Sequence, residues 1–586
     1  MKTKLLYLIA TLFISFASLS AFASDGIVTM KAEKNRVITL YVYPENAYIV
    51  EGAVFKEELE KGLKAYTVTD DEGVVTVKGT IISLVCAQNG LTAIDLSKCP
   101  LLEDLSCTWN ELTELNLENN SELIRLYCSG NQLKTLDLSN CVNLSILECS
   151  SNELGTIDLS KNNELTKLKC ANTGIVELDL SPCKKLKTLE FNTNGLTAID
   201  LSPCTVLERL VCSENEISSL DLSACTKILE VFCQDNTMSE LKLAKGAPIV
   251  DLRCQNNEIE TLDLSDCRGL KNLECATNKL TELNLSGCSS LETFNCHENA
   301  LESLDLSSSP NITELDCSEN QIAQLNIKGC TKLFSLDCFS NQLTALDLTK
   351  NKALTKLTCS DNQIAELKIF PEGKELSEFS CSNNLLTELN LGASKQLTNL
   401  YASNNQLLAL DVTACDSLEV LSVSDNQLKD LKLAGCEKLT SVFCKKNQLT
   451  NIDFTGCQSL STVYCAENNI SEASMDRLVA SLPNLQGTET QGTLWVYNNM
   501  EGNEHNVFTT THQAVAQNKA WKAQEKTADG WQDYAGTTPS AIDHLTQDAL
   551  QGETITFDLQ GRRTNRQQSG ICIVKHKNGK TIKTLK

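Results

Sequence analysis

Residues 102–128, LEDLSCTWNELTELNLENNSELIRLYC, contain the pattern that decides the fold of this 586-residue chain. The position held by Cys107 recurs every 21 residues, and one extra residue in the stretch 370–373 is the only slip of the frame. The series is Cys86, Cys107, Cys128, Cys149, Cys170, Phe191, Cys212, Cys233, Cys254, Cys275, Cys296, Cys317, Cys338, Cys359, Cys381, Ala402, Val423, Cys444 and Cys465. Such a period is typical of a solenoid, in which each repeat buries its apolar face only against its neighbours. We therefore expect function to lie on a long surface and not in a cleft.

Within one repeat, apolar and polar residues alternate over a short segment. Leu105 and Cys107 are expected to face inward and Ser106 outward, which is the period-two pattern of a strand. Stacked repeats then form a parallel sheet along one face, and the half with Leu115 and Leu117 returns along the opposite side in extended form. Each half has ten or eleven residues, which leaves no room for a full helix.

Both halves of the repeat, LxxLxCxxNxL and LxxLxLxx(C/N)xxL, follow the leucine-rich repeat consensus. The predicted fold is a mostly β solenoid of the α/β type: a right-handed leucine-rich repeat solenoid of 21-residue repeats, capped at both ends, with a small C-terminal β domain. The expected divisions are a signal peptide (1–23), an N-terminal β-rich cap (24–80), the solenoid (81–470), a C-terminal cap (471–537) and a final sorting or anchoring domain (541–586).

Of the 28 cysteines, 27 fall in two periodic series inside the repeats. The second series lies thirteen residues after the first and comprises Cys99, Cys141, Cys183, Cys204, Cys225, Cys267, Cys288, Cys330, Cys415, Cys436 and Cys457, with Asn120, Asn162 and Asn351 in the same slot elsewhere. A disulfide scaffold is one interpretation for an exported chain. However, equivalent residues on adjacent coils stand about 4.8 Å apart and point the same way, whereas a disulfide needs Cβ atoms about 3.8 Å apart. We predict packed, reduced thiols.

An asparagine lies three residues after the ladder position in every repeat from Asn89 to Asn468 except one, where Thr173 stands. The chain turns out of the strand at this point, so interior backbone groups lose their partners. A side-chain amide offers two donors and an acceptor to such groups. We expect each asparagine to be structural.

The N-terminus has the layout of a cleavable secretory signal: a basic start, an apolar run over residues 5–16 and small residues at 21–23. No later segment approaches the roughly 18 apolar residues needed to cross a bilayer, so the mature protein is expected to be exported and soluble. A formal charge of -24 excludes nucleic acid as a partner and would repel anionic membranes, while a basic partner would meet a favourable field.

The two ends of the solenoid need caps, because terminal coils expose apolar surface. Before residue 81 the pattern predicts strands at 37–43 and 73–79 and a short helix at 57–64, with independent binding by this segment as an alternative. After Asn468 it predicts helices at 473–482 and 510–518 and a strand at 493–497. Trp521, Trp531 and Tyr534 are expected to close the core of this cap, an aromatic ligand pocket being the alternative. A linker at 536–540 leads to the last module, with a turn at Gln560 and Gly561.

The sequence offers little for catalysis. It has five histidines and no CxxC, HExxH, GxSxG or phosphate-loop motif. His297 is the only histidine in the repeats, and it adjoins Cys296, but adjacent strand residues point to opposite faces. We expect no enzyme activity, no catalytic residues, no metal and no cofactor.

The outward residue before each ladder position forms a stripe that changes character along the chain. The stripe is Ser106, Tyr127, Glu148, Lys169, Glu190, Val211, Phe232, Arg253, Glu274, Asn295, Asp316, Asp337, Thr358, Ser380, Tyr401, Ser422, Phe443 and Tyr464. Its middle is charged and mixed, and its far end is aromatic. Exposed aromatic residues with cations nearby, as at the far end, resemble interface hot spots in composition. The predicted partner-binding residues are Tyr401, Phe443, Lys445, Lys446 and Tyr464, with Trp109 and Tyr127 as a second candidate near the other end. Packing of Phe443 and Tyr464 under the cap is the alternative.

Residues 81–470 resemble the internalin-type leucine-rich repeat proteins, in particular the internalin J branch with its cysteine ladder. The tail, FDLQGRR followed by SGICIVK, looks like the C-terminal sorting domain of type IX secretion cargo in Gram-negative bacteria of the Bacteroidetes group. These resemblances imply export across the outer membrane, attachment to the outer cell surface with loss of the tail, and a virulence-related role in adhesion to host cells or other bacteria, or in biofilms.

The expected function is therefore that of a secreted, surface-attached module that binds a protein partner. Two alternatives stay open: a structural surface or biofilm-matrix component that binds its own copies, and a glycan-binding protein. Self-association of the purified protein would favour the first, and glycan-array binding through the aromatic stripe would favour the second.

Overall fold

The computed structural model describes residues 26–538, apart from 45–47, 61, 370–375, 392–393 and 501–503, together with the backbone of four short strands beyond them. These are β40 (Thr556–Phe557), β41 (Arg563–Thr564), β42 (Ile571–Lys575) and β43 (Thr581–Leu585), which pair antiparallel in the order β41-β40-β42-β43. The predicted signal peptide and the predicted turn at Gln560 and Gly561 lie outside the described residues. The chain forms two compact units, residues 1–354 and residues 355–586.

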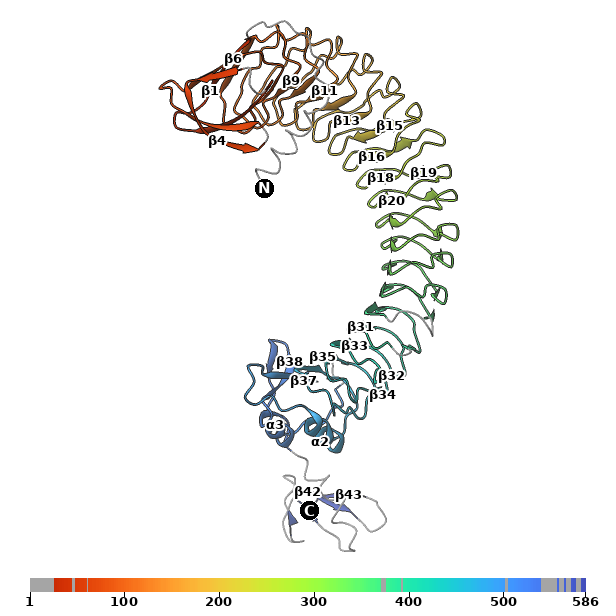
Figure 1. Ribbon diagram of the computed structural model, residues 1–586. Helices are drawn as coiled ribbons and strands as arrows, with labels where there is room; N and C mark the ends of the chain where they lie inside the picture. Colours follow the sequence, from red (N-terminus) through yellow and green to blue (C-terminus); the bar gives the residue numbers. More distant parts are fainter. Residues whose placement is uncertain are drawn as a thin grey trace. The chain divides into compact units, whose positions relative to one another are not determined.

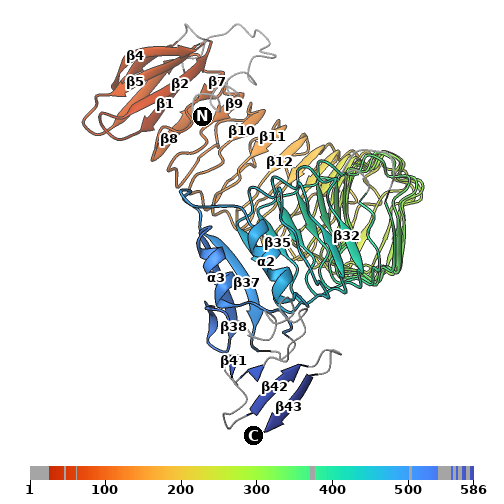
Figure 2. The same cartoon turned by 90° about the horizontal axis from the view of Figure 1, so that it is seen from below.

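The N-terminal segment pairs with both sides of the first coil (Figure 2). One sheet has the order β3-β6-β1-β8, and β2, flanked by β5 and β7, joins the second layer to the first ladder strand. The strands are β1 (Gly26–Lys31), β2 (Val37–Tyr43), β3 (Tyr48–Glu51), β4 (Ala53–Glu60), β5 (Leu63–Val68), β6 (Val74–Gly79), β7 (Ser83–Val85) and β8 (Ala93–Lys98). The strands predicted at 37–43 and 73–79 are confirmed as β2 and β6.

The helix predicted at 57–64 is wrong. Residues 53–60 form β4 and residues 63–68 form β5, and the two strands pair antiparallel across a turn at Gly62, whose φ is 85°. The run of Lys and Glu in this segment has good helix propensity, but propensity yields to tertiary context. Here pairing with β5 and the contact of Phe55 with Tyr66, at 5.8 Å between ring centroids, decide the structure.

The ladder strands of the N-terminal unit are three residues long and pair in parallel, each residue opposite the residue 21 later. They are β7, β9 (Asp104–Ser106), β10 (Arg125–Tyr127), β11 (Ile146–Glu148), β12 (Lys167–Lys169), β13 (Thr188–Glu190), β14 (Arg209–Val211), β16 (Glu230–Phe232), β18 (Asp251–Arg253), β20 (Asn272–Glu274), β22 (Thr293–Asn295), β24 (Glu314–Asp316) and β26 (Ser335–Asp337). Their central residues, such as Leu105 and Leu126, are fully buried. The leucine-rich repeat solenoid predicted from the period is thus confirmed.

The second half of each coil runs along the opposite side in extended form, as Figure 1 shows for β15 and β19 within this unit. It forms short strands in some coils of the unit: β15 (Ser219–Asp221), β17 (Glu240–Lys242), β19 (Thr261–Asp263), β21 (Glu282–Asn284), β23 (Ser303–Asp305), β25 (Gln324–Asn326) and β27 (Ala345–Asp347). The first six of these strands pair in parallel two by two, for example β15 with β17.

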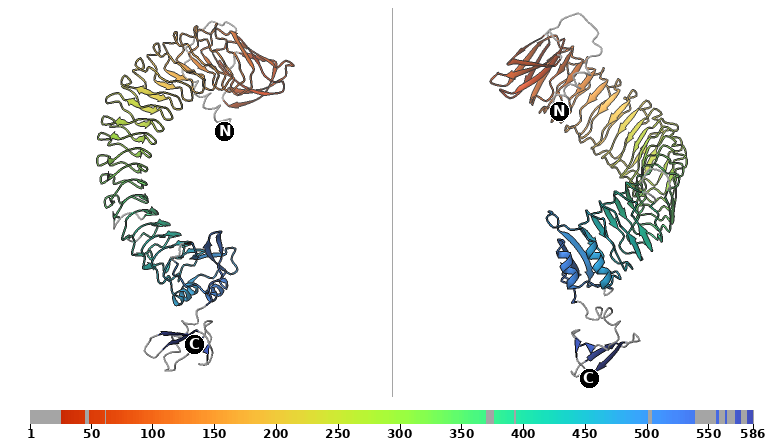
Figure 3. Two further views of the ribbon diagram at one scale, coloured as in Figure 1. Left: turned by 180° about the vertical axis from the view of Figure 1, so that it is seen from behind. Right: turned by 60° about the horizontal axis from the view of Figure 1, so that its bottom comes forward.

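The C-terminal unit continues the same repeat and then closes it with a cap (Figure 3). Its ladder strands are β28 (Lys356–Thr358), β30 (Glu378–Ser380), β31 (Asn399–Tyr401), β33 (Val420–Ser422), β35 (Ser441–Phe443) and β36 (Thr462–Tyr464), and its opposite strands are β29 (Glu366–Lys368), β32 (Ala409–Asp411) and β34 (Asp430–Lys432). The cap comprises α2 (Glu472–Ser481), β37 (Gly492–Asn498), α3 (Thr510–Gln517), β38 (Trp521–Thr527) and β39 (Gly530–Asp533). The two helices and the strand at 493–497 agree with the predictions.

The asparagine series holds the turns, as predicted. In the coil of Asn215, the amide Nδ2 donates to the carbonyls of Phe191 and Cys212, and Oδ1 accepts from the backbone N–H of Leu196. The residue before the asparagine is in the left-handed region, with φ of 54° for Glu214. Thr173 makes only one of the hydrogen bonds that an asparagine makes at this position: its hydroxyl donates to the Cys170 carbonyl.

The 27 cysteines in the described part of the chain are buried thiols and form no disulfide. Burial raises the pKa of the Cys107 and Cys444 thiols to about 12, so these side chains stay protonated at neutral pH. Reactivity follows the thiolate, so a sealed ladder of this kind packs like a column of small apolar residues.

Candidate partner-binding face

The ladder face consists of the outward side chains of the ladder strands, together with the residue after each ladder position. In each strand the central residue points into the core, so the first and third residues share the outer face. Arg125 and Tyr127, half-buried on either side of the buried Leu126, are an example. This geometry doubles the stripe expected from the sequence, because it adds the first residue of every strand.

The ladder face of the N-terminal unit is charged, and its charges pair with one another. Lys169 Nζ lies 2.8 Å from Glu190 Oε2, and Arg209 Nε lies 3.2 Å from Glu190 Oε1. Arg209 also pairs with Glu230. Burial alone would raise the pKa of Glu190, but hydrogen bonds and charge from Lys169 and Arg209 outweigh it and lower the pKa.

The one aromatic side chain in the middle of this stripe is enclosed by cations. The Phe232 ring has the guanidinium carbon of Arg209 4.7 Å from its centroid and that of Arg253 4.8 Å from it. Both faces of a ring attract cations. Phe232 is therefore part of the internal charge network and is not an open contact site.

The last four ladder strands of the C-terminal unit present a different chemistry. None of the outward residues of β31, β33, β35 and β36 is charged. They are Asn399, Tyr401, Val420, Ser422, Ser441, Phe443, Thr462 and Tyr464. Register places Phe443 directly opposite Tyr464, as the sequence predicted, and Tyr464 directly opposite Trp495 of the cap strand β37.

Two tryptophans from the cap extend this end of the stripe. Tyr464 lies 5.7 Å from Trp495 and 5.3 Å from Trp531 between ring centroids, both in edge-to-face geometry, and the two tryptophans lie 5.5 Å apart. Trp495 Nε1 donates to Gln524 Oε1 at 2.8 Å, which fixes the indole. All three rings are half-buried. We call Tyr401, Phe443, Tyr464, Trp495 and Trp531 the aromatic surface.

Sequence reasoning placed Trp531 in the core of the cap with Trp521 and Tyr534, and only the last two are buried. Trp495 was not identified as a site residue. The alternation of buried Leu494 and Val496 around it would have shown that its side chain faces outward. Tyr464 thus packs against the cap, as the alternative held, but the cap residues it meets belong to the same outer face.

Lys445 and Lys446 stand beside these rings in different ways. Lys445 Nζ lies 3.1 Å from Glu467 Oε1 and 6.0 Å from the Tyr464 ring centroid. Lys446 is the left-handed residue of its turn, with φ of 55°, and its Nζ lies 3.0 Å from Asp425 Oδ1 of the preceding coil. Both ammonium groups are thus held by carboxylates of the chain.

Trp109 and Tyr127 occupy different parts of the coil. Trp109 is 56% exposed in a left-handed turn position with φ of 54°, where bulky residues are rare. Its indole covers Gly130 of the next coil, since a Cβ there would come within 2.6 Å of the ring. Tyr127 lies half-buried on β10, and burial with the charge of Glu148 raises its pKa to about 12.

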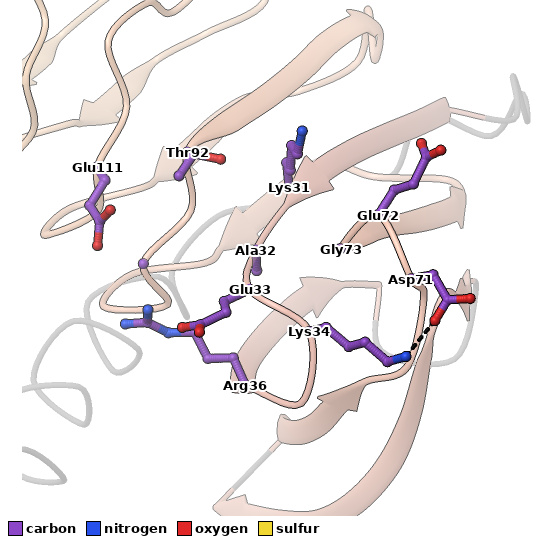
Figure 4. Close-up of a pocket in the computed structure, with 11 residues that line it drawn as sticks. Lys31, Ala32, Glu33, Lys34, Arg36, Asp71, Glu72, Gly73, Thr92 and Glu111 are labelled. Atoms are coloured by element: carbon purple, nitrogen blue, oxygen red, sulfur yellow. Dashed lines mark hydrogen bonds and ion pairs between the residues drawn. The ribbon is translucent and has the colours of Figure 1, made fainter.

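Two cavities lie beside coils of the N-terminal unit, one lined by side chains of both charges and one by acidic and neutral side chains. One of about 330 Å³ lies beside the first coil, where Lys34 pairs with Asp71 and the Arg36 guanidinium covers Gly90 (Figure 4). A second, of about 420 Å³, is lined by residues of 114–118 and 135–140. Across the described ranges, no group of three or more His, Cys, Asp or Glu could hold a metal ion. The prediction of no enzyme activity stays a prediction.

Comparison with known proteins establishes the fold of the chain but not its family. No family model matches it, and no curated protein matches it. The structure of the plant peptide hormone receptor RGFR1 in complex with RGF2 is similar to this chain, with 18% sequence identity and a TM-score of 0.52. The matched region covers 74% of this chain and 88% of that chain. The chain therefore has the leucine-rich repeat fold.

Two bacterial structures were also found. The functional domain of InlJ from Listeria monocytogenes, described as including a cysteine ladder, has 22% identity and a TM-score of 0.35, with 89% of this chain and 93% of that chain covered. YopM from Yersinia enterocolitica has 25% identity and a TM-score of 0.48, with 66% of this chain and 91% of that chain covered.

The part of the chain that the structure describes contains no helix with the length and hydrophobicity of a membrane span.

Proposed function

We propose that this protein binds a protein partner through the aromatic surface of its C-terminal unit. The observation that carries the proposal is the absence of charge from the outward residues of the four ladder strands between Asn399 and Tyr464, next to the ring cluster of Tyr464, Trp495 and Trp531.

Desolvation decides which face can bind at low cost. Removing water from a charged group costs several kcal/mol per ion unless the partner replaces every contact with water. The free-energy cost of desolvation is smaller for neutral side chains such as tyrosine, serine and asparagine. Tyr401, which is 40% exposed, and the half-buried tryptophans supply large apolar area with few rotatable bonds. Exposed rings of this kind dominate the energy of protein interfaces.

The comparisons support a polypeptide as the class of ligand, since the RGFR1 receptor is described in complex with RGF2. The finer role extends the proposal: the protein is exported, held at the outer surface of a Gram-negative cell through its C-terminal residues, and used for adhesion to host cells or other bacteria. The signal-like residues 1–23 and the tail motif support export.

A pull-down from host and bacterial surface extracts tests the proposal, with the full chain as bait. Replacing Phe443 and Tyr464 together by Ser should remove the captured partner while the thermal unfolding midpoint stays within a few degrees. The matched control replaces Lys169 and Glu190 by Ser on the N-terminal unit, and it should capture the partner as the native chain does. Unchanged capture by the first variant would rule out the aromatic surface.

A further inference from the structure

Lys526 of the cap strand β38 differs from the cations of the ladder face and from Lys522 of its own strand. Within the described residues, Lys522 and each Lys or Arg side chain on the ladder face have a carboxylate oxygen within 4.0 Å, and Lys526 has none. The pairs are Arg125–Asp104, Lys167–Glu148, Lys169–Glu190, Arg209–Glu190, Arg253–Asp251, Lys356–Glu378, Lys445–Glu467 and Lys522–Asp533.

The ammonium of Lys526 lies at the aromatic surface. Lys526 stands directly opposite Trp531 in the pairing of β38 with β39, and its Nζ lies 5.3 Å from the Trp531 ring centroid. Trp531 in turn contacts Tyr464 and Trp495. The side chain is half-buried, so the charge sits over the indole at the edge of the neutral face.

A cation over an indole is stabilised by the ring but keeps its N–H donors. An incoming carboxylate can therefore bind Lys526 without displacing an internal partner. At Lys445 or Lys522 the same carboxylate would first have to displace Glu467 or Asp533. The chain as a whole carries a charge of -24 and repels an acidic partner at long range, so the contact with Lys526 would favour one orientation of such a partner on the aromatic surface.

We propose that the partner of the aromatic surface presents a carboxylate side chain to Lys526, next to an apolar or aromatic side chain that packs on Trp531 and Trp495. The inference rests on the proposed function and narrows it to a polypeptide segment in which an acidic residue adjoins an apolar one. The charge pair sets the register of the segment, and the rings provide the apolar contact.

Selection of a random linear peptide display library on the full chain tests this inference, with the enriched peptides then titrated against variants. Peptides should carry Asp or Glu beside an apolar residue and bind Lys526→Gln roughly tenfold more weakly than the native chain. Lys526→Arg should bind within about threefold of native, because it keeps the charge. The matched control, Lys522→Gln, removes a cation that is already paired and should also bind within about threefold.

The outcomes separate the two proposals. Peptides that lose binding to the Phe443→Ser, Tyr464→Ser variant but bind Lys526→Gln as tightly as native would overturn the role of Lys526 and leave the proposed function in place. Peptides that bind all variants equally, or a library that yields no binder, would overturn both.

Discussion

The ladder faces of the two units share one backbone and differ in side-chain chemistry. On the N-terminal unit Lys169, Glu190 and Arg209 neutralise one another across adjacent coils. On the C-terminal unit the equivalent positions of three successive coils hold Tyr401, Ser422 and Ser441. Since the inward leucines and the turn asparagines are the same in both, the repeat fixes the fold and leaves the outer face to vary. We therefore expect the difference to matter more for binding than for stability.

Transferring the charged pattern to the C-terminal unit should have the largest effect. We expect Ser422→Lys with Phe443→Glu, which copies the arrangement of Lys169 and Glu190, to weaken partner binding about 100-fold, since a ring is lost and two charges must be desolvated. Titration with the partner recovered by pull-down measures this. The reciprocal change, Lys169→Ser with Glu190→Phe, should leave affinity within about threefold, and a comparable loss there would remove the distinction between the faces.

Removing a turn asparagine should cost the same in both units. Asn447 and Asn257 each donate to three carbonyls and accept from one backbone N–H. Replacing either by Ala leaves these buried groups unsatisfied, so we expect about 2 kcal/mol of destabilisation in urea unfolding for each variant. A cost confined to one unit would mean that the coils are not equivalent inside.

The sequence predicted the interior of both units because the period constrains it directly. An inward leucine or a turn asparagine has one environment, repeated in every coil, so a single repeat was enough to predict it. The errors lie where the period stops: the segment at 57–64, whose pairing with β5 overrides its helix propensity, and Trp531, which comes from a hairpin outside the repeat. The partner of Lys446 could have been predicted, since Asp425 lies 21 residues earlier.

Restoring the missing asparagine should stabilise the N-terminal unit. Thr173 reaches the Cys170 carbonyl, whereas the neighbouring Asn152 also donates to Cys128 of the preceding coil and accepts from Leu133. Thr173→Asn should therefore raise the free energy of unfolding by about 1 kcal/mol. Thr173→Val, which removes the hydroxyl, should lower it, and a gain in that variant would contradict the role given to the turn.

The ion pairs of the N-terminal face should matter least for stability. We expect Glu190→Gln to cost about 0.5 kcal/mol at pH 7. The folded pKa of Glu190 is lowered, so its contribution is present above the ordinary glutamate pKa and is lost as pH falls through the folded value. Unfolding of native and variant chains should therefore converge under acid, whereas Ser422→Ala should show a pH-independent difference.

Hydrogen–deuterium exchange of the full chain, with and without the partner recovered by pull-down, tests the central claim most directly. The account predicts that bound partner slows exchange in residues 399–401, 441–443, 462–464 and 492–498 and leaves residues 125–190 unchanged. Protection confined to the charged strands of the N-terminal unit would contradict it.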